Sequence, residues 1–242
     1  MPVYGQFAGV YDAFMADTPY LFWADYIQAH IPAGGLVADL ACGTGSMTLL
    51  LKQRGYDMIG IDRSADMLSI ASEKAANENL NILFLKQDIL NMDLYGSVDA
   101  MVSVCDGFNY FLTEEHLRAA FKRCSLFLNP GGVFIFDMNT EYKFKEVLGG
   151  NTFTDTQKNA SYIWKNRYDT QTQINEYSVF FITGTNSFTE THRQRAYPPE
   201  TVMGLLKEAG FSGIRVNDAY TYDPPKPDSV RVSFTAKTAA IK

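Results

Sequence analysis

The alternation of short apolar runs with helix-period segments between Leu36 and Asn139 restricts the fold more than any other feature of this sequence. The apolar runs have the length of buried strands, and the segments between them repeat their apolar residues at helical spacing. The expected strands are 36–40, 57–62, 81–88, 98–106 and 133–139, and the expected helices are 46–55, 64–79 and 113–128. Strands and helices that alternate in this way predict an α/β fold, in which a parallel sheet is covered by helices on both faces.

The chain on either side of this segment is organised differently. The aromatic-rich residues 1–33 predict a helical N-terminal arm made of two short helices. Residues 160–197 predict two or three antiparallel strands, whereas residues 198–211 return to helical spacing before two more strands near 213–220 and 230–237. We therefore expect three parts. Residues 1–140 form the arm and the first part of the core, and residues 198–242 form the C-terminal part of the core sheet. Residues 141–197 form an antiparallel β insert that serves as a lid or substrate subdomain.

Composition and charge narrow the class of protein. The 242 residues suit one large α/β domain with an insert. The formal net charge of −6 disfavours binding to nucleic acid or acidic membranes, because such contacts need clustered Lys and Arg. The 3 cysteines are widely spaced, and neither a signal peptide nor a membrane-spanning run appears. We expect a cytoplasmic monomer or homodimer, without a membrane segment and without a bound metal.

A small-residue loop follows the first expected strand and enters a helix. The strand ends in Asp39, and the loop runs from Ala41 to Gly45, at the edge where open α/β sheets bind ligands. The nicotinamide fingerprint G-x-G-x-x-G is incomplete here, since Thr48 occupies its third glycine position. The Asp39 carboxylate would repel a pyrophosphate at the helix N-terminus but would bind an ammonium group, with a contribution of about 1.5–3 kcal/mol.

Two further acids follow the next two strands. Asp62 is placed to accept the hydroxyl groups of a ribose, and Asp88 to accept from an exocyclic amine such as that of adenine. Each aspartate alone also suits an ordinary turn. Three acids at three successive strand ends, matched to an ammonium, a ribose and an adenine amine, predict S-adenosylmethionine rather than NAD as the ligand.

The stretch D-L-A-C-G-T-G, from Asp39 to Gly45, resembles the first motif of the class I S-adenosylmethionine-dependent methyltransferases, with Ala41 where many members have glycine. The resemblance covers about residues 36–139 and 200–240. It implies a Rossmann-like, seven-stranded and mostly parallel sheet that ends in an antiparallel hairpin. It also implies an enzyme that uses S-adenosylmethionine as a methyl donor.

The resemblance also implies site residues, carried over position by position. The implied cofactor-binding residues are Tyr11, Asp39, Ala41, Cys42, Gly43, Gly45, Asp62, Arg63, Met67, Asp88, Ile89 and Cys105. Tyr11 belongs to the pattern Y-x-x-F-A-x-x-Y-D-x-F-M, which together with the β insert resembles bacterial small-molecule methyltransferases, including sugar-amine N-methyltransferases. In such relatives an N-terminal tyrosine closes over the cofactor. Asp106 would lie beside the sulfonium, and we expect it to be catalytic.

The sequence indicates the residues around the methyl acceptor less clearly than those around the cofactor. The stretch V-C-D-G-F-N-Y (104–110) lacks both the N/D-P-P-Y/F pattern of DNA amino-methyltransferases and the Pro-Cys of cytosine C5 enzymes, so Cys105 is expected to be an ordinary buried cysteine. On a strand, Glu190, His192 and Gln194 share one face. That face either presents His192 to the acceptor as a base or lies in water. Trp164 and Tyr168 either roof the same pocket or fill the core of the small sheet.

The sequence therefore predicts a methyltransferase that acts on a nitrogen or oxygen atom of a small molecule, with His192 and Asp106 as catalytic residues. An RNA or protein methyltransferase is an alternative that would need a basic or groove-like rim. A non-catalytic S-adenosylmethionine-binding module would keep the three acids but have its acceptor pocket filled by side chains. An NAD-dependent oxidoreductase ranks last because of Asp39.

Overall fold

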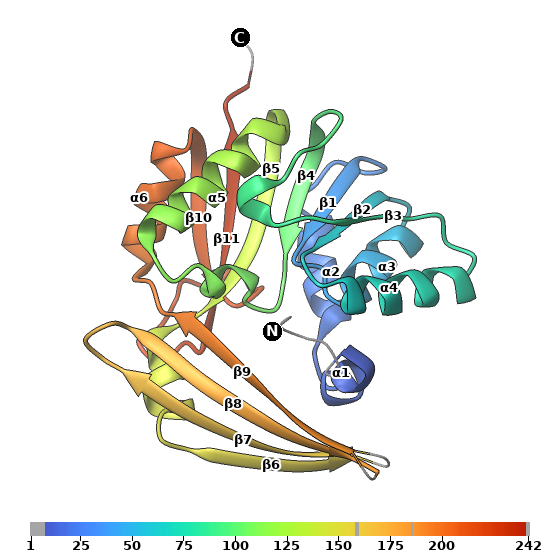
Figure 1. The fold of residues 1–242 in the computed structure, drawn as a ribbon. Coiled ribbons are helices and arrows are strands. Elements are labelled where there is room, and N and C mark those ends of the chain that lie inside the picture. Colours follow the sequence, from blue (N-terminus) through green and yellow to red (C-terminus); the bar gives the residue numbers. More distant parts are fainter. Residues whose placement is uncertain (1–7, 158–159, 185, 241–242) are drawn as a thin grey trace.

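The computed structural model describes residues 8–157, 160–184 and 186–240 of the chain. Figure 1 shows a sheet with helices on both sides and, beside its carboxyl edge, a separate curved sheet. Tyr4 and Phe7 of the N-terminal aromatic pattern lie outside the described residues.

The core sheet has 7 strands in the order β10-β11-β5-β4-β1-β2-β3. The strands are β1 (Leu36–Leu40), β2 (Asp57–Asp62), β3 (Leu83–Lys86), β4 (Val98–Ser103), β5 (Leu128–Asn139), β10 (Phe211–Asp218) and β11 (Arg231–Thr238). Strands β1 to β5 run parallel, whereas β11 pairs antiparallel with both β5 and β10. This confirms the expected Rossmann-like sheet with its C-terminal hairpin. The strand order reverses between β1 and β4, where a ligand site is expected.

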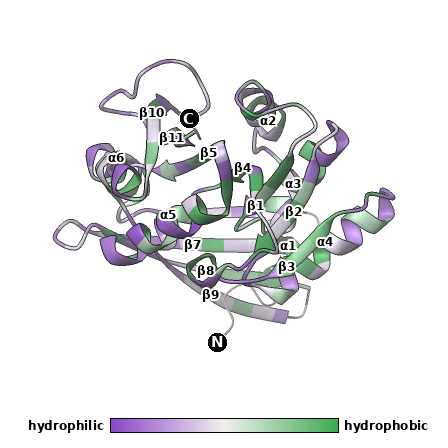
Figure 2. Ribbon diagram, turned by 90° about the horizontal axis from the view of Figure 1, so that it is seen from above, coloured by the Kyte–Doolittle hydropathy of each residue, from purple (hydrophilic) through white to green (hydrophobic). Residues whose placement is uncertain are grey.

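Helices cover both faces of this sheet. The helices are α1 (Ala8–Phe14), α2 (Tyr20–Gln28), α3 (Ser46–Gln53), α4 (Ala65–Asn77), α5 (Glu114–Phe127) and α6 (Pro199–Glu208), with short turns η1 (Ile89–Asn91), η2 (Gly107–Tyr110) and η3 (Lys143–Leu148). One apolar core lies under α5 and α6, and a second under α2 and α3. In Figure 2 the central strands are mainly apolar, while α4 carries both polar and apolar residues. Among the described residues, no helix is both long and apolar enough to cross a membrane.

Side-chain caps set the start of the two helices α4 and α5. The hydroxyl oxygen of Ser64 accepts from the Met67 N–H at 3.3 Å, and that of Thr113 accepts from the His116 N–H at 3.2 Å. Each bond satisfies an N–H group that lacks a partner in the first helical turn. The caps fix where α4 and α5 begin relative to the strand ends before them.

The insert is a 4-stranded antiparallel sheet in the order β6-β7-β8-β9. Its strands are β6 (Thr152–Gln157), β7 (Ala160–Asp169), β8 (Ile174–Thr183) and β9 (Asn186–Arg195). The expected antiparallel strands over 160–197 are confirmed as β7, β8 and β9, whereas β6 was not expected, because this polar edge strand gives little hydrophobic signal. Strand β5 also begins earlier than expected, since Leu128 already pairs with Val98 before a register shift around Pro130.

Aromatic contacts attach the insert to the rest of the molecule at two places. Near the end of β5, the Phe144 ring lies 6.2 Å from that of Tyr168, and Trp164 packs in the same apolar cluster. At the other end, Phe14 of α1 contacts Tyr162 with ring centroids 4.7 Å apart. Trp164 and Tyr168 thus pack in the core beneath the small sheet.

Gly45 has a left-handed conformation at the start of α3 and lies against α4. Its φ is +77°, and an added Cβ would lie 3.0 Å from the Ala71 Cβ. We predict that Gly45→Ala lowers the free energy of unfolding by about 2–4 kcal/mol, through backbone strain and overpacking. Gly43→Ala is the matched control, because Gly43 has a φ of +55° but nothing within 4 Å of an added Cβ. It should cost only about 1 kcal/mol in urea unfolding, and equal losses would contradict the packing role of Gly45.

Candidate active site

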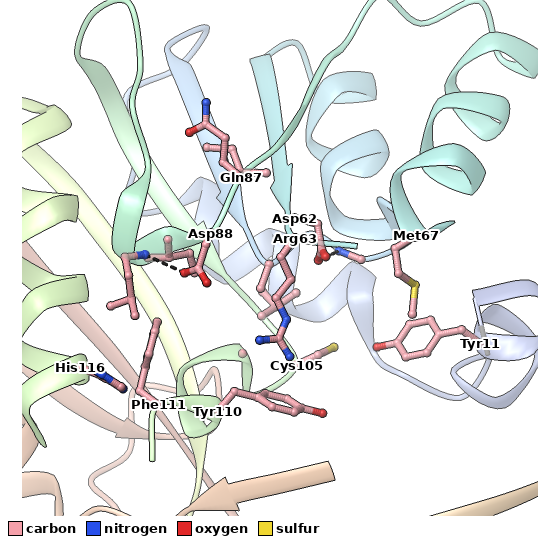
Figure 3. Close-up of a pocket in the computed structure, with 17 residues that line it drawn as sticks. Tyr11, Asp62, Arg63, Met67, Gln87, Asp88, Cys105, Tyr110, Phe111 and His116 are labelled. Carbon is pink, nitrogen blue, oxygen red and sulfur yellow. Dashed lines mark hydrogen bonds between the residues drawn. The ribbon is translucent and has the colours of Figure 1, made fainter. Parts of the chain in front are cut away.

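A cavity of about 340 Å³ opens at the carboxyl ends of β1, β2 and β4. Figure 3 shows Tyr11 and Met67 at one end of it, His116 and Phe111 at the other, and Arg63 between them. The lining includes many residues expected to bind the cofactor: Tyr11, Ala41, Gly43, Asp62, Arg63, Met67, Asp88, Ile89 and Cys105. Asp39, Cys42 and Gly45 lie behind this lining, in the strand end and loop that support it.

Asp39 is a buried carboxylate with an unsatisfied oxygen. It is 1% exposed, and its Oδ2 accepts a 2.5 Å hydrogen bond from the Thr48 hydroxyl. Its Oδ1 has no hydrogen-bond partner among the described residues. Burial, with a smaller contribution from the nearby carboxylate of Asp62, raises the pKa of Asp39 to about 7. An ammonium group would satisfy this oxygen and favour the ionised carboxylate.

Asp62 connects the loop after β1 to the start of α4. Its Oδ2 accepts from the Gly43 N–H at 2.9 Å, and its Oδ1 accepts from the Ser64 N–H at 2.8 Å. Each carboxylate oxygen has further acceptor capacity, so Asp62 can also receive hydroxyl groups from the cavity that it lines. Burial raises its pKa, although the two N–H bonds act against that shift.

The far end of the cavity is built around Asp88. Its Oδ1 accepts from the Leu90 N–H at 2.9 Å and caps the short turn η1, whose first residue Ile89 also lines the cavity. Lining residues that the sequence did not single out are Ile61, Gln87, Leu90, Val104, Gly107, Tyr110, Phe111 and His116. Val104, Gly107 and Tyr110 follow the fourth strand, which is a usable signal for them. No motif marks Phe111 or His116.

The N-terminal arm is held against the loop after β1 by Asp12. The Thr44 hydroxyl donates to Asp12 Oδ1 at 2.5 Å, and the Lys74 ammonium lies 2.8 Å from Asp12 Oδ2. Both contacts place the neighbouring Tyr11 over the cavity from the α1 side. Asp12 appears in the aromatic pattern of the arm, but its role becomes visible only in three dimensions.

The turn after β4 contains two successive non-glycine residues with left-handed backbone. Cys105 has a φ of 62° and Asp106 a φ of 57°. Both backbone N–H groups donate to the buried carboxylate of Asp137, at 3.0 Å and 2.7 Å. Tyr220 donates a further hydrogen bond to Asp137, and Arg231 pairs with both Asp137 and Asp106.

The side chains of this turn have different surroundings. The Cys105 thiol lies 3.6 Å from the Tyr20 hydroxyl, and burial raises its pKa to about 12, so it is a protonated thiol rather than a nucleophile. Asp106 is bonded on both oxygens, to Arg231 at 2.7 Å and to the Gln194 amide at 2.6 Å. The structure therefore places Asp106 beside the cavity, where it joins the core to the insert.

His192 lies on the inner face of the insert and is 3% exposed. Its ring stacks on Tyr177 at 4.8 Å, and its Nδ1 lies 3.2 Å from the Tyr110 hydroxyl, which is also 2.9 Å from the Tyr177 hydroxyl. Burial, with a smaller contribution from the positive charge of Arg63, lowers the pKa of His192 to about 4. His192 is therefore neutral near pH 7 and reaches the cavity through Tyr110. The alternative of a solvated face does not hold for His192 or Gln194.

The known proteins to which this chain is similar include methyltransferases that match most of its length. The family model described as "Methyltransferase domain" matches residues 37–132. The chain is 37% identical over 240 residues to "Putative methyltransferase YqeM" of Bacillus subtilis (strain 168), with 97% of each chain covered. A crystal structure of an S-adenosylmethionine-dependent methyltransferase from Clostridium acetobutylicum ATCC 824 is similar at a TM-score of 0.87 and 30% identity, over 98% of this chain and 99% of that one. The sugar N-methyltransferase KedS8 from Streptoalloteichus sp ATCC 53650 has a similar fold, with a TM-score of 0.77, 19% identity and coverage of 95% and 93%.

The raised pKa of Asp39 predicts a pH-dependent affinity for a ligand with an ammonium group. The ionised carboxylate binds that group, so S-adenosylhomocysteine should bind more weakly as the pH falls through about 7, by about tenfold per pH unit once Asp39 is mostly protonated. Calorimetric titration at several pH values measures this. Asp39→Asn keeps the shape of the side chain, and it should weaken binding at pH 7.5 by about tenfold or more and abolish the dependence. The same slope in wild type and variant would contradict the assignment.

Proposed function

The chain belongs to the S-adenosylmethionine-dependent methyltransferases, and from this premise we propose that it transfers a methyl group to a nitrogen or oxygen atom of a small-molecule acceptor. S-adenosylmethionine is the cofactor of this family, and the residues of the cavity fit it. The fit rests on the Oδ1 of Asp39, which has no hydrogen-bond partner in the part of the chain that the structure describes and which matches an ammonium group beneath a glycine-containing loop. The bound cofactor supplies an activated methyl group on its sulfonium.

Within this proposal different residues of the cavity bind different parts of the cofactor. Asp39 and the loop from Ala41 through Cys42 and Gly43 to Gly45 hold the methionine part. Asp62 accepts the ribose hydroxyls, and Asp88 with the Ile89 N–H binds the adenine. Arg63 and Met67 flank the nucleoside, Cys105 borders the methyl group, and Tyr11 covers the cofactor from the arm.

The small-molecule acceptor is supported above all by the contacts of Tyr110 with the insert. Tyr110 lines the cavity and contacts His192 and Tyr177, so the insert bounds the space beside the cofactor on the Tyr110 side. The negative net charge supports the same reading, since an RNA substrate would need a basic rim. The fold shared with a sugar N-methyltransferase is consistent with it.

The two residues expected to be catalytic have narrower roles in this proposal. A histidine with a pKa near 4 is a weak base. In this proposal His192 therefore orients the Tyr110 hydroxyl and does not take a proton from the acceptor. Asp106 is held by Arg231 and Gln194 at the edge of the site, where it fixes the turn after β4 and the approach of the insert.

The test of this function is methyl transfer from S-adenosylmethionine labelled in its methyl group. The purified protein is incubated with an ultrafiltered metabolite extract, with total RNA, or with a dialysed protein extract. We predict label only in the metabolite fraction. Label in RNA or protein would identify the alternative substrate class, and binding of the cofactor without transfer to any fraction would identify a binding module.

We expect the Tyr110 hydroxyl to affect the rate of methyl transfer more than the affinity for the cofactor. We predict that Tyr110→Phe lowers the rate of label transfer by about tenfold, because the acceptor loses a hydrogen-bonding group, while the Kd of S-adenosylhomocysteine changes by less than about threefold.

The matched control for this variant is Tyr197→Phe. The Tyr197 hydroxyl donates to the Phe111 carbonyl, away from His192, so its loss should leave the wild-type rate unchanged.

Because His192 is already neutral, His192→Gln should change the rate by the same factor at every pH between about 5.5 and 7.5. A wild-type rate that follows an ionisation near pH 6.5, absent from His192→Gln, would contradict this role.

A further inference from the structure

The peptide groups after β4 point their N–H and carbonyl groups to opposite sides of the chain. The peptides 104–105 and 105–106 are trans, so each carbonyl is directed opposite to the N–H of the same peptide. Both N–H groups are directed at Asp137. The carbonyl oxygens of Val104 and Cys105 are therefore directed away from Asp137.

The order of the strands shows what lies on that other side. Strand β4 lies between β5 and β1, and Asp137 is a residue of β5. The cavity lies on the β1 side, and both Val104 and Cys105 line it. The two carbonyl oxygens are thus directed to the β1 side of β4, the side on which the cavity lies.

This orientation is held firmly at an energetic cost. Left-handed backbone is unfavourable for a non-glycine residue, and here two such residues follow one another. Asp137 is 0% exposed and is itself fixed by Tyr220 and Arg231. Strain that the surroundings hold in place is typical of functional turns.

We propose that the carbonyl oxygens of Val104 and Cys105 bind the N–H groups of an amine acceptor beside the transferred methyl group, with Asp137 as the positioning residue that directs them. This inference rests on the proposed methyltransferase function and narrows its acceptor to nitrogen. A neutral primary amine offers two N–H groups for two carbonyl oxygens and keeps its lone pair for the reaction.

The chemistry of the neighbouring groups also favours an amine over a hydroxyl. The nitrogen lone pair forms the new N–C bond as the C–S bond breaks, and the electrons of that bond remain on sulfur as a neutral thioether. The product is an ammonium ion, which later loses a proton to water. A hydroxyl acceptor would need a base, and three groups near the turn are poorly suited to that role: His192 is a weak base, the Cys105 thiol is protonated and Asp106 is ion-paired.

A pair of cofactor analogues tests the direction of the carbonyls. Sinefungin carries an amine-bearing carbon in place of the sulfur of S-adenosylhomocysteine, so its additional amine occupies the position of the transferred methyl group. We predict that the wild-type protein binds sinefungin about tenfold more tightly than S-adenosylhomocysteine. Equal or weaker binding of sinefungin would overturn the carbonyl pair. Binding of neither compound would instead overturn the proposed function.

Variants of two similar carboxylates test the role of Asp137. Asp137→Asn removes one acceptor of an N–H group and the charge that pairs with Arg231, so the preference for sinefungin should fall below about threefold while S-adenosylhomocysteine still binds. Asp99→Asn is the control, because Asp99 also accepts a backbone N–H, from Leu36 at 2.9 Å, but near the amino end of β4. It should keep the tenfold preference. A preference that survives in Asp137→Asn would contradict the positioning role.

The acceptor class is tested without any variant. A metabolite extract is treated with an amine-selective acetylating reagent, and its labelling is compared with that of a mock-treated extract. We predict that blocking the amines abolishes label transfer. Transfer that survives the treatment would overturn the amine inference alone, whereas transfer to neither extract would contradict the proposed function.

Discussion

Buried carboxylates that accept pairs of backbone N–H groups hold together the loops on which this site depends. Asp62 joins the loop after β1 to the start of α4, and Asp137 holds both N–H groups of the turn after β4. Parallel strands end at one edge, so their connecting loops meet there without ladder partners. A carboxylate with two acceptor oxygens joins such loops at low cost in conformational entropy, because one rigid group satisfies two donors.

The sheet and most of the cofactor side could be predicted because they depend on local signals. Strand and helix periodicity indicated the α/β core, and Asp39, Asp62 and Asp88 are recognisable as acids at successive strand ends. Asp137 and Arg231 could not be found in this way, since their roles come from contacts between β5, β11 and the turn after β4, far apart in the sequence. The edge strand β6 was missed because exposed polar strands carry little periodic signal.

The acceptor side joins three parts of the chain that are separate in sequence. The arm brings Tyr11 over the cavity, the turn after β4 brings Tyr110, and the insert brings His192 and Tyr177. Phe14 packs against Tyr162 and Phe181, so the arm and the far end of the insert are in direct contact. In the proposed function the core sheet provides the cofactor pocket, and the segments outside it select the acceptor.

A crystal structure of the protein with bound sinefungin would test this arrangement most directly. We predict that the amino-acid ammonium of sinefungin lies against Asp39 and the ribose against Asp62, and that the additional amine lies within hydrogen-bond distance of the carbonyl oxygens of Val104 and Cys105. An adenosyl group bound outside this cavity would contradict the cofactor site. An additional amine directed away from both carbonyl oxygens would contradict the role of Asp137.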